Sequence, residues 1–146
     1  MLTDLVELRG LADAYARCMD TLDQTSFAQL WTSDGVLEVY ENGPDTEPTG
    51  VLHPRHFHFA FERLSVFKRT LHHVTTHHAD VNGEEATGIT HCAAHHIDRP
   101  GGADSQDLVM HIVYRDKYRR EEQRWRFVSR RIEVLFRESR TVQELG

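Results

Sequence analysis

Apolar residues recur at two different periods along this chain. Near the start they lie three or four positions apart, which is the spacing of an amphipathic helix over residues 5–22. The apolar stripe of this helix consists of Leu5, Leu8, Leu11, Ala12, Tyr15, Met19 and Leu22. After residue 70 the apolar and polar residues alternate, which is typical of half-buried strands.

Between these two regions the pattern predicts short elements. Asp23, with Thr25 and Ser26 behind it, offers N-cap chemistry for a second helix, "FAQLW". The segment "GVLEVY" predicts a strand, and the turn-rich "ENGPDTEPTG" follows it. A third helix is expected to begin at Pro54, because proline is tolerated in the first turn. One face of this helix would stack Phe57, Phe61, Leu64 and Phe67.

The last two thirds of the chain predict a meander of antiparallel strands. Asn82 and Gly83 separate "HHVTTHHADV" from "ATGITHCAAHHI", and Asn-Gly between alternating runs is a strong hairpin signal. The segment "RPGGAD" is expected to turn the chain into "QDLVMHIVYRDKYRR", and "REEQ" into "RWRFVSRRIEVLF". Helices followed by strands predict an α+β fold, and residues 1–146 are of the length of one domain.

Composition narrows the possible classes of function. The 146 residues are 39% hydrophobic and 27% charged, which is typical of a soluble globular protein. The net charge of -6 argues against nucleic acid as a partner. The basic residues in "YRDKYRREEQRWRFVSRR" are interleaved with acidic ones, which favours a solvated sheet face. The N-terminal residues are acidic where a signal peptide is basic, and no apolar run could span a bilayer. We therefore expect a cytoplasmic protein without a membrane partner.

Four of the eleven histidines lie in "LHHVTTHHADVNG". Regular alternation would place His72, Val74, Thr76 and His78 on one face of the strand and His73, Thr75 and His77 on the other. Across the hairpin, His91 and His95 would share a face and His96 would take the opposite one. A three-histidine zinc site is geometrically possible, but the pairs alternate faces and no HExxH spacing occurs. The prediction is therefore no metal, and a solvated histidine-rich face for most of these residues.

Asp20 and Tyr15 are two further candidates for chemistry. Asp20 falls where the first helix should end, and a carboxylate there meets the negative end of the helix dipole. It is either an exposed acid on a frayed turn or a functional group. Tyr15 is either a core residue or a group that orients a substrate carbonyl or acts as an acid. A histidine whose imidazole is held by a carboxylate can act as a general base at neutral pH. The spacing alone does not place His72 opposite Asp20.

Three segments resemble the SnoaL-like domains of the nuclear transport factor 2-like superfamily. They are "LRGLADAYARCMDTLDQTSFAQLWTSDGVLEV", "LHHVTTHHADVNGEEATG" and "YRDKYRREEQRWRFVSRR", which together cover the chain from about Leu5 to about Phe136 in the family's order. Within that family the sequence is most similar to the group of scytalone dehydratase, bile acid 7α-dehydratase and hexachlorocyclohexane dehydrochlorinase. The resemblance implies a cone-shaped α+β barrel, in which a strongly curved antiparallel sheet packs on three N-terminal helices and encloses an apolar pocket.

The same resemblance implies a function. Its enzymes are cofactor-free lyases with a His–Asp dyad, which falls on His72 and Asp20. Tyr15 falls on a tyrosine of the dehydratases. The implied activity is a dehydratase-like lyase, or an isomerase, acting on a small hydrophobic, cyclic substrate. The alternative is a non-catalytic module of the same fold that binds a small molecule or a partner protein.

Further candidates would contact the substrate: Tyr40, Arg130, Trp31 and Thr76. Arg130 falls on a family arginine five residues after Trp125, with Arg131 beside it. Thr76 departs from the family, which often has Asn four residues after the dyad histidine. A homo-oligomer is also implied, a trimer before a dimer, because the outer face of such a sheet needs covering.

Overall fold

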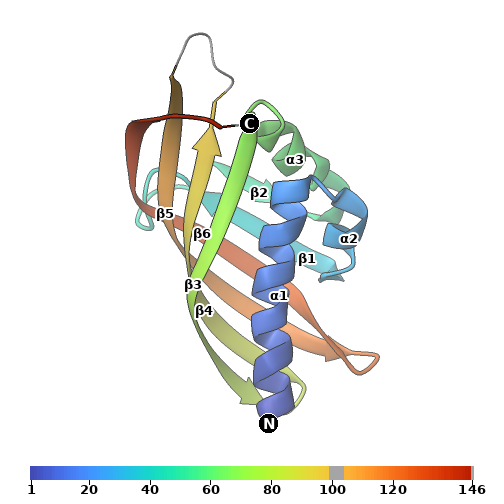
Figure 1. Ribbon diagram of the computed structural model, residues 1–146. Helices are drawn as coiled ribbons and strands as arrows, with labels where there is room; N and C mark the ends of the chain where they lie inside the picture. The colour runs from blue at the N-terminus through green and yellow to red at the C-terminus, as the bar shows by residue number, and fades with distance from the viewer. Residues whose placement is uncertain (99–103, 146) are drawn as a thin grey trace.

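The computed structural model describes residues 1–98 and 104–145. The elements in chain order are α1 (Leu2–Thr21), α2 (Gln24–Ala28), β1 (Trp31–Tyr40), β2 (Gly50–Leu52), the 3-10 helix η1 (Pro54–His56), α3 (His58–Leu64), β3 (Arg69–Asn82), β4 (Glu85–Ile97), β5 (Ser105–Glu121) and β6 (Arg124–Val142). Most of the predicted "RPGGAD" turn lies outside the described residues. Figure 1 shows α1 running alongside β3, with α2 and α3 at one end of it.

The N-terminal helices follow the predicted apolar pattern. The middle of the stripe on α1 is buried, while Leu5 and Leu22 at its two ends stay exposed. Asp23 caps α2, and its Oδ1 accepts a hydrogen bond from the backbone N–H of Ser26 at 3.0 Å. The second helix lies three residues earlier than predicted, because it ends at Ala28 and Trp31 already begins β1. The third helical region begins at Pro54 as predicted but consists of η1 followed by α3.

The six strands form one sheet in the order β2-β1-β6-β5-β4-β3. The α+β class and the helices packed on a curved sheet are confirmed (Figure 1). The prediction of an antiparallel sheet is wrong at one place, where β1 pairs with β6 in parallel. This pairing joins strands separated by most of the chain, so no local signal could reveal it. The sheet does not close into a barrel, and β2 and β3 are its edges.

Two tight turns join the long strands. Asn82 pairs with Glu85, so Gly83 and Glu84 form the turn between β3 and β4. Gly83 has a φ of 65°, which fits the first central position of a type II′ hairpin turn. The predicted hairpin is therefore confirmed. The turn between β5 and β6 consists of Glu122 and Gln123, which both have positive φ although neither is glycine.

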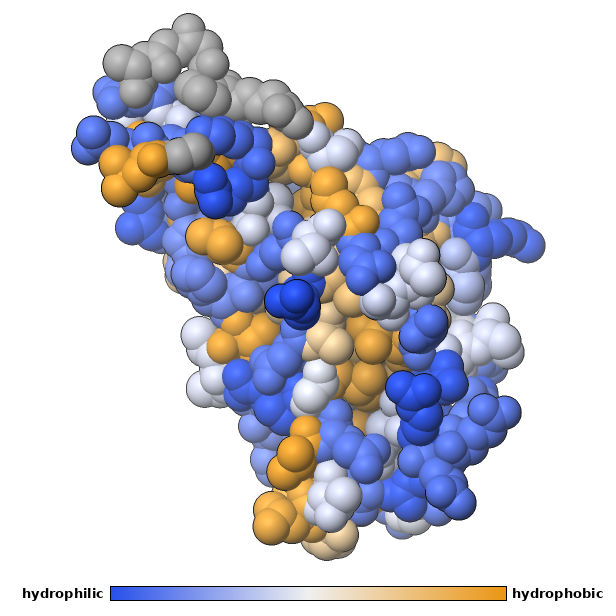
Figure 2. All heavy atoms as spheres, turned by 45° about the vertical axis from the view of Figure 1, so that its right-hand side comes forward, coloured by the Kyte–Doolittle hydropathy of each residue, from blue (hydrophilic) through white to orange (hydrophobic). Residues whose placement is uncertain are grey.

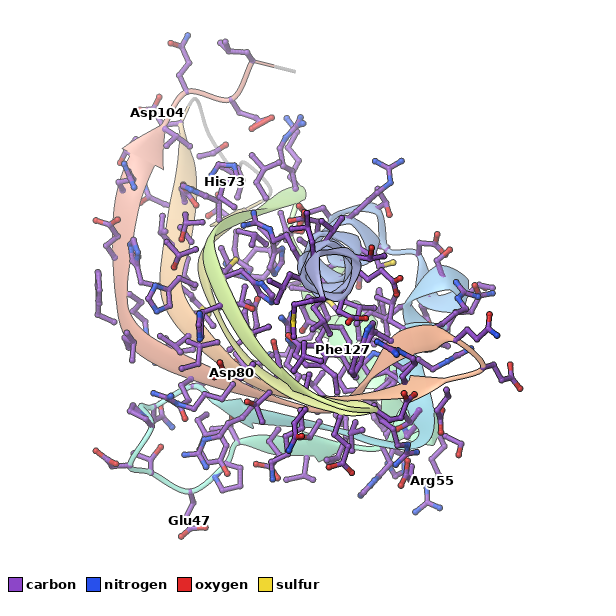
Figure 3. The ribbon with its side chains drawn as sticks, turned by 90° about the horizontal axis from the view of Figure 1, so that it is seen from below. Glu47, Arg55, His73, Asp80, Asp104 and Phe127 are labelled. Carbon is purple, nitrogen blue, oxygen red and sulfur yellow. The ribbon has the colours of Figure 1, made fainter. Side chains whose placement is uncertain are left out.

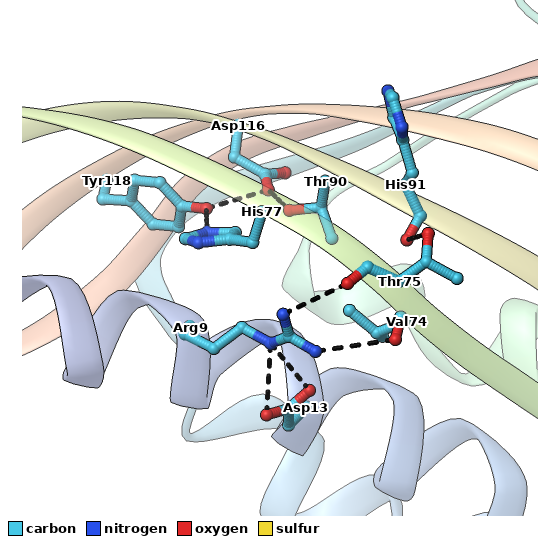
Figure 4. A network of polar contacts seen from close by, with 9 residues as sticks. All are labelled: Arg9, Asp13, Val74, Thr75, His77, Thr90, His91, Asp116 and Tyr118. Carbon is cyan, nitrogen blue, oxygen red and sulfur yellow. Dashed lines mark hydrogen bonds and ion pairs between the residues drawn. The ribbon is translucent and has the colours of Figure 1, made fainter.

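A bulge in β3 changes which histidines share a face. Val74 pairs with Cys92, but the next paired residue, His77, lies opposite Thr90, so β3 contains one extra residue. Past the bulge the alternation is inverted, and His77 joins His72 on the face towards α1. The predicted faces of His77 and His78 are therefore wrong. Arg9 of α1 donates to the carbonyl oxygens of Val74 and Thr75 at this bulge (Figure 4).

The core lies between the helices and the concave face of the sheet. Phe27 packs edge-on against Phe57 and Phe61 with ring centroids 5.1 Å apart in both cases. Phe127 of β6 points to the same interior, on the α1 side of the sheet (Figure 3). Burying each such ring contributes about 1.5–3 kcal/mol. The aromatic cluster thus packs α2 and α3 together at one end of α1.

The face of the molecule drawn in Figure 2 is largely hydrophilic. Figure 2 shows apolar atoms as patches between polar side chains on the face that it draws. Among the described residues, no helix combines the length and the hydropathy that crossing a bilayer requires.

Candidate active site

Asp20 lies in the last turn of α1, directly beside the first residues of β3. Its Oδ1 lies 2.6 Å from His72 Nδ1 and accepts a hydrogen bond from Thr70 Oγ1 at 3.0 Å. Its Oδ2 accepts the backbone N–H of His72 at 2.9 Å. One carboxylate therefore holds both the backbone and the ring of His72, and it links the end of α1 to the sheet.

These contacts orient the His72 imidazole. A carboxylate accepts and does not donate, so the Nδ1 that faces Asp20 carries a proton and Nε2 keeps a lone pair. Partial burial works against the charge on Asp20, but the hydrogen bonds from His72 and Thr70 outweigh it and lower the pKa of this carboxyl. The pair thus combines an ionised carboxylate with an imidazole whose second nitrogen can accept a proton.

The pair is open to solvent on one side. A groove of about 340 Å³ runs between α1 and β3, and Arg17, Asp20, His72 and Val74 are among the residues lining it. The Asp20 side chain is 21% exposed and the His72 side chain only 7%. The carboxylate is therefore reached from the groove, while the imidazole faces the interior.

His96 is a neighbour of this pair that the sequence analysis gave no role. It lies on the inner face of β4, is 6% exposed, and its ring centre is 6.1 Å from that of His72. Its Nδ1 donates to the carbonyl oxygen of Leu108 at 3.0 Å, which leaves Nε2 as an acceptor. Burial lowers the pKa of His96, so a neutral ring is favoured beside His72. Strand alternation indicates the correct face of His96, but nothing in the sequence distinguishes it from the other ten histidines as a site residue.

Tyr15 lies deeper in the core than the pair. Its ring packs against Phe27, Tyr114 and Phe127, and the side chain is almost completely buried. Burial raises the pKa of the Tyr15 hydroxyl, so this group stays protonated. The structure shows no hydrogen bond between Tyr15 and His72 or Asp20.

Arg130 is buried beneath Tyr15. Its Nε and Nη2 donate to the two oxygens of Asp116 at 2.8 and 3.0 Å, and its guanidinium carbon lies 4.3 Å from the centre of the Tyr15 ring. Tyr118 also donates to Asp116, and His77 Nε2 lies 3.4 Å from the Tyr118 hydroxyl (Figure 4). Arg130 Nη1 has no hydrogen-bond partner among the described residues. The predicted contact residue is thus part of a buried polar network, with one donor left over.

The other predicted contact residues lie away from the pair. Tyr40 lies on the convex face of β1, donates to Glu38 at 3.0 Å and stacks under Arg131. Thr76 lies at the bulge, with its hydroxyl 2.9 Å from His91 Nδ1. Trp31 packs in the aromatic core against Phe57 and Phe127. The structure therefore brings together Asp20 and His72, and it does not bring Tyr40, Thr76 or Trp31 to them.

The described residues contain no group of three or more His, Cys, Asp or Glu side chains arranged to hold a metal ion.

Comparison with known proteins agrees with this fold. The model of the SnoaL-like domain matches residues 1–131. The chain belongs to the SnoaL-like domain family. No curated protein matches this SnoaL-like domain.

Solved structures with a similar fold include named enzymes. Hexachlorocyclohexane dehydrochlorinase LinA-type3 from Novosphingobium barchaimii LL02 superposes with a TM-score of 0.81 at 15% identity, covering 99% of this chain and 96% of that one. A candidate scytalone dehydratase from Novosphingobium aromaticivorans DSM 12444 gives a TM-score of 0.74 at 18% identity, covering 99% and 90%. The Kfla4162 protein from Kribbella flavida gives 0.77 at 21% identity, covering 93% of each chain. At these identities the likeness establishes the fold.

Proposed function

We propose that this SnoaL-like domain is a cofactor-independent lyase, most concretely a dehydratase, or an isomerase, with His72 as its general base. The observation that carries the proposal is the 2.6 Å contact between Asp20 and His72 Nδ1. It keeps the proton on Nδ1 and leaves Nε2 free to accept one. A positioned base of this kind typically contributes a factor of about 10²–10⁴ to the rate.

The proposed reaction balances without a cofactor. His72 Nε2 takes a proton from a carbon atom of the substrate, and Asp20 stabilises the imidazolium that forms. The electron pair of the broken C–H bond forms a C=C bond as the neighbouring C–O bond breaks. The departing hydroxide takes a proton from an acidic side chain and leaves as water. His72 then releases its proton to solvent, and the acid regains one from solvent, so both groups return to their starting state. If halide leaves instead, the reaction is a dehydrohalogenation, and if the proton returns to another carbon it is an isomerisation.

The acid that protonates the leaving hydroxyl is proposed to be Tyr15. Its buried hydroxyl stays protonated, and the Arg130 guanidinium lies against its ring. Tyr40 is not proposed for this role, because it lies on the convex face of the sheet. His96 is a positioning candidate, since its Nε2 is free to accept a hydrogen bond from a substrate hydroxyl near His72.

The substrate is proposed to be a small hydrophobic ring compound. Two enzymes of the same fold are named for hexachlorocyclohexane and for scytalone, and these two compounds are the first probes to use. Chloride release and loss of water, respectively, measure their turnover.

The test compares the wild-type domain with His72→Gln and Asp20→Asn on both probes. Turnover of one probe by the wild type is expected, with a loss of about 10²–10⁴-fold in each variant. Circular dichroism checks that the variants fold. His78→Gln is the matched control, because His78 lies on the same strand but is 74% exposed and pairs with Asp80. Full activity in His72→Gln would overturn the proposal. Binding of a probe without turnover would support the non-catalytic module instead.

A further inference from the structure

A second imidazole–carboxylate pair lies on the convex face of the sheet. His95 of β4 has its Nδ1 2.6 Å from Asp107 Oδ2, and the Asp107 side chain is 5% exposed. Asp107 Oδ1 also accepts the backbone N–H of His96 at 3.2 Å. The carboxylate, which comes from β5, is therefore held by two groups of β4. As at His72, the proton lies on Nδ1 of the histidine and the lone pair on Nε2.

A second histidine lies beside His95. His73 pairs with Ala93 across the β3–β4 ladder, so His73 and His95 are diagonal neighbours on the same face. Their ring centres are 4.9 Å apart at an interplanar angle of 53°. Figure 3 shows His73 on the side of β3 that faces away from α1. Both rings are thus outside the core that contains His72.

The distance between the two ring centres is compatible with two imidazoles bound to one metal ion. With a metal–nitrogen bond of about 2.1 Å, each ring centre lies about 3.2 Å from the metal, so two rings are about 4.5 Å apart at an angle of about 90° and about 5.2 Å apart at a tetrahedral angle. The observed 4.9 Å falls between these values. The rings of His72 and His96, at 6.1 Å, lie beyond them.

Asp107 contacts Nδ1 of His95, the ring nitrogen that would not bind the metal. Histidines that bind metals usually donate their second ring N–H to a carboxylate or carbonyl, which fixes the tautomer and raises the basicity of the bound nitrogen. Asp107 has this position relative to His95. A free Nε2, a fixed tautomer and a neighbouring imidazole at this distance together fit a metal site.

We propose that His73 and His95 bind a late first-row divalent cation, such as Zn²⁺, Ni²⁺ or Cu²⁺, with Asp107 as the outer acceptor. Imidazole ligands favour these ions over Mg²⁺ and Ca²⁺. No third His, Cys, Asp or Glu of the described residues joins the two histidines in a cluster that holds a metal. The remaining coordination positions therefore belong to water, and the site is open and of moderate affinity. The site is independent of the proposed lyase function, because it lies on the opposite face of the sheet.

The experiment titrates untagged, chelator-treated protein with NiCl₂ and with ZnCl₂ by isothermal calorimetry. One equivalent is expected to bind to the wild type, and His73→Ala and His95→Ala each abolish that binding. Asp107→Asn keeps both ligands and weakens the affinity about 10-fold or more. His78→Ala is the matched control on β3 and leaves binding unchanged, since His78 is exposed and its imidazole pairs with Asp80.

A spectroscopic measurement on the wild type removes any dependence on how the variants fold. Electron paramagnetic resonance with one equivalent of Cu²⁺ is expected to show two coordinated imidazole nitrogens. The proposal is overturned if the wild type binds no stoichiometric ion, if binding survives in both His73→Ala and His95→Ala, or if a single nitrogen is coordinated.

Discussion

The two faces of the sheet carry imidazole–carboxylate pairs with the same contact distance. The nitrogen–oxygen distance is 2.6 Å in both, and in both the aspartate also accepts a backbone N–H of the strand that carries the histidine. The origin of the carboxylate differs. Asp20 comes from the end of α1 and is 21% exposed, whereas Asp107 comes from the neighbouring strand β5 and is 5% exposed.

The surroundings of the two histidines differ more than the pairs themselves. His72 faces the buried His96 and the interior, whereas His95 faces the exposed His73 on the convex face. A short contact between histidine and aspartate therefore does not by itself assign a role. The role assigned to each histidine depends on the direction of its free Nε2 and on the side chains next to that nitrogen.

The largest expected difference between the two pairs is in turnover. Asp20→Asn removes the charge that stabilises the imidazolium of His72, so kcat falls about 10²–10⁴-fold with whichever probe the wild type converts. The exposed pair of His78 and Asp80 on the same strand supplies the control, Asp80→Asn, which leaves kcat unchanged. Equal losses in Asp20→Asn and Asp80→Asn would show that charge near β3, and not the pair, determines the rate.

Of the aspartates compared, the fully buried Asp116 is expected to contribute most to the stability of the fold. Asp116 holds Arg130, and both side chains are at most 1% exposed. Asp116→Ala leaves a buried cation without a partner and is expected to lower the free energy of unfolding by about 3–5 kcal/mol. Arg119→Ala, which breaks an exposed pair with Asp34, lowers it by less than about 1 kcal/mol. Urea denaturation measures both, and a loss below about 1 kcal/mol in Asp116→Ala would contradict the burial argument.

Between the two imidazole pairs, the convex one is expected to matter more for stability. Asp107→Ala removes a carboxylate that is only 5% exposed and leaves the backbone N–H of the buried His96 without its partner, at a loss of about 2–3 kcal/mol. Asp20 lines the groove, so water can take the place of the carboxylate in Asp20→Ala. The expected loss in the free energy of unfolding is therefore about 1–2 kcal/mol. Urea denaturation of the two variants measures both losses. A larger loss in Asp20→Ala would mean that the link between α1 and β3 contributes more stability than the burial of Asp107.

The smallest expected effect is the pH dependence of stability. The pKa of Asp20 is lowered in the folded protein, so this carboxyl contributes its stability above the unfolded pKa of about 3.9 and loses it as the pH falls through the folded value. The difference in stability between the wild type and Asp20→Asn should therefore shrink from pH ~6 to pH ~3. A constant difference would mean that Asp20 has the same pKa in both states.

The local parts of this fold could be predicted from the sequence. The stripe on α1, the Asp23 cap and the hairpin at Gly83 depend on residues close in sequence, and all three are confirmed. The turn at Glu122 and Gln123 carries no glycine, so its left-handed backbone could not be inferred from composition.

The parts that depend on distant contacts could not be predicted. The bulge in β3 is a single extra residue held by Arg9, sixty-five positions away from Val74, and it inverts the face of every later residue. Asp20 and His72 were linked through the family resemblance, and their contact spans fifty-two positions. The sequence predicts no metal because the histidine pairs alternate faces and no HExxH spacing occurs. Alternation gives no distance between His73 and His95, which the structure places with ring centres 4.9 Å apart.

The most direct test of the central claim is the tautomer of His72 in its neutral form. Long-range ¹H–¹⁵N NMR on metal-free, ¹⁵N-histidine-labelled protein measures it, with His72→Gln to assign the signals. The account predicts a protonated Nδ1 and an unprotonated Nε2, with the Nδ1 proton shifted downfield by its hydrogen bond to Asp20 and losing that shift in Asp20→Asn. A proton on Nε2 in the neutral ring would contradict it, because His72 would then have no lone pair to accept a proton from a substrate carbon.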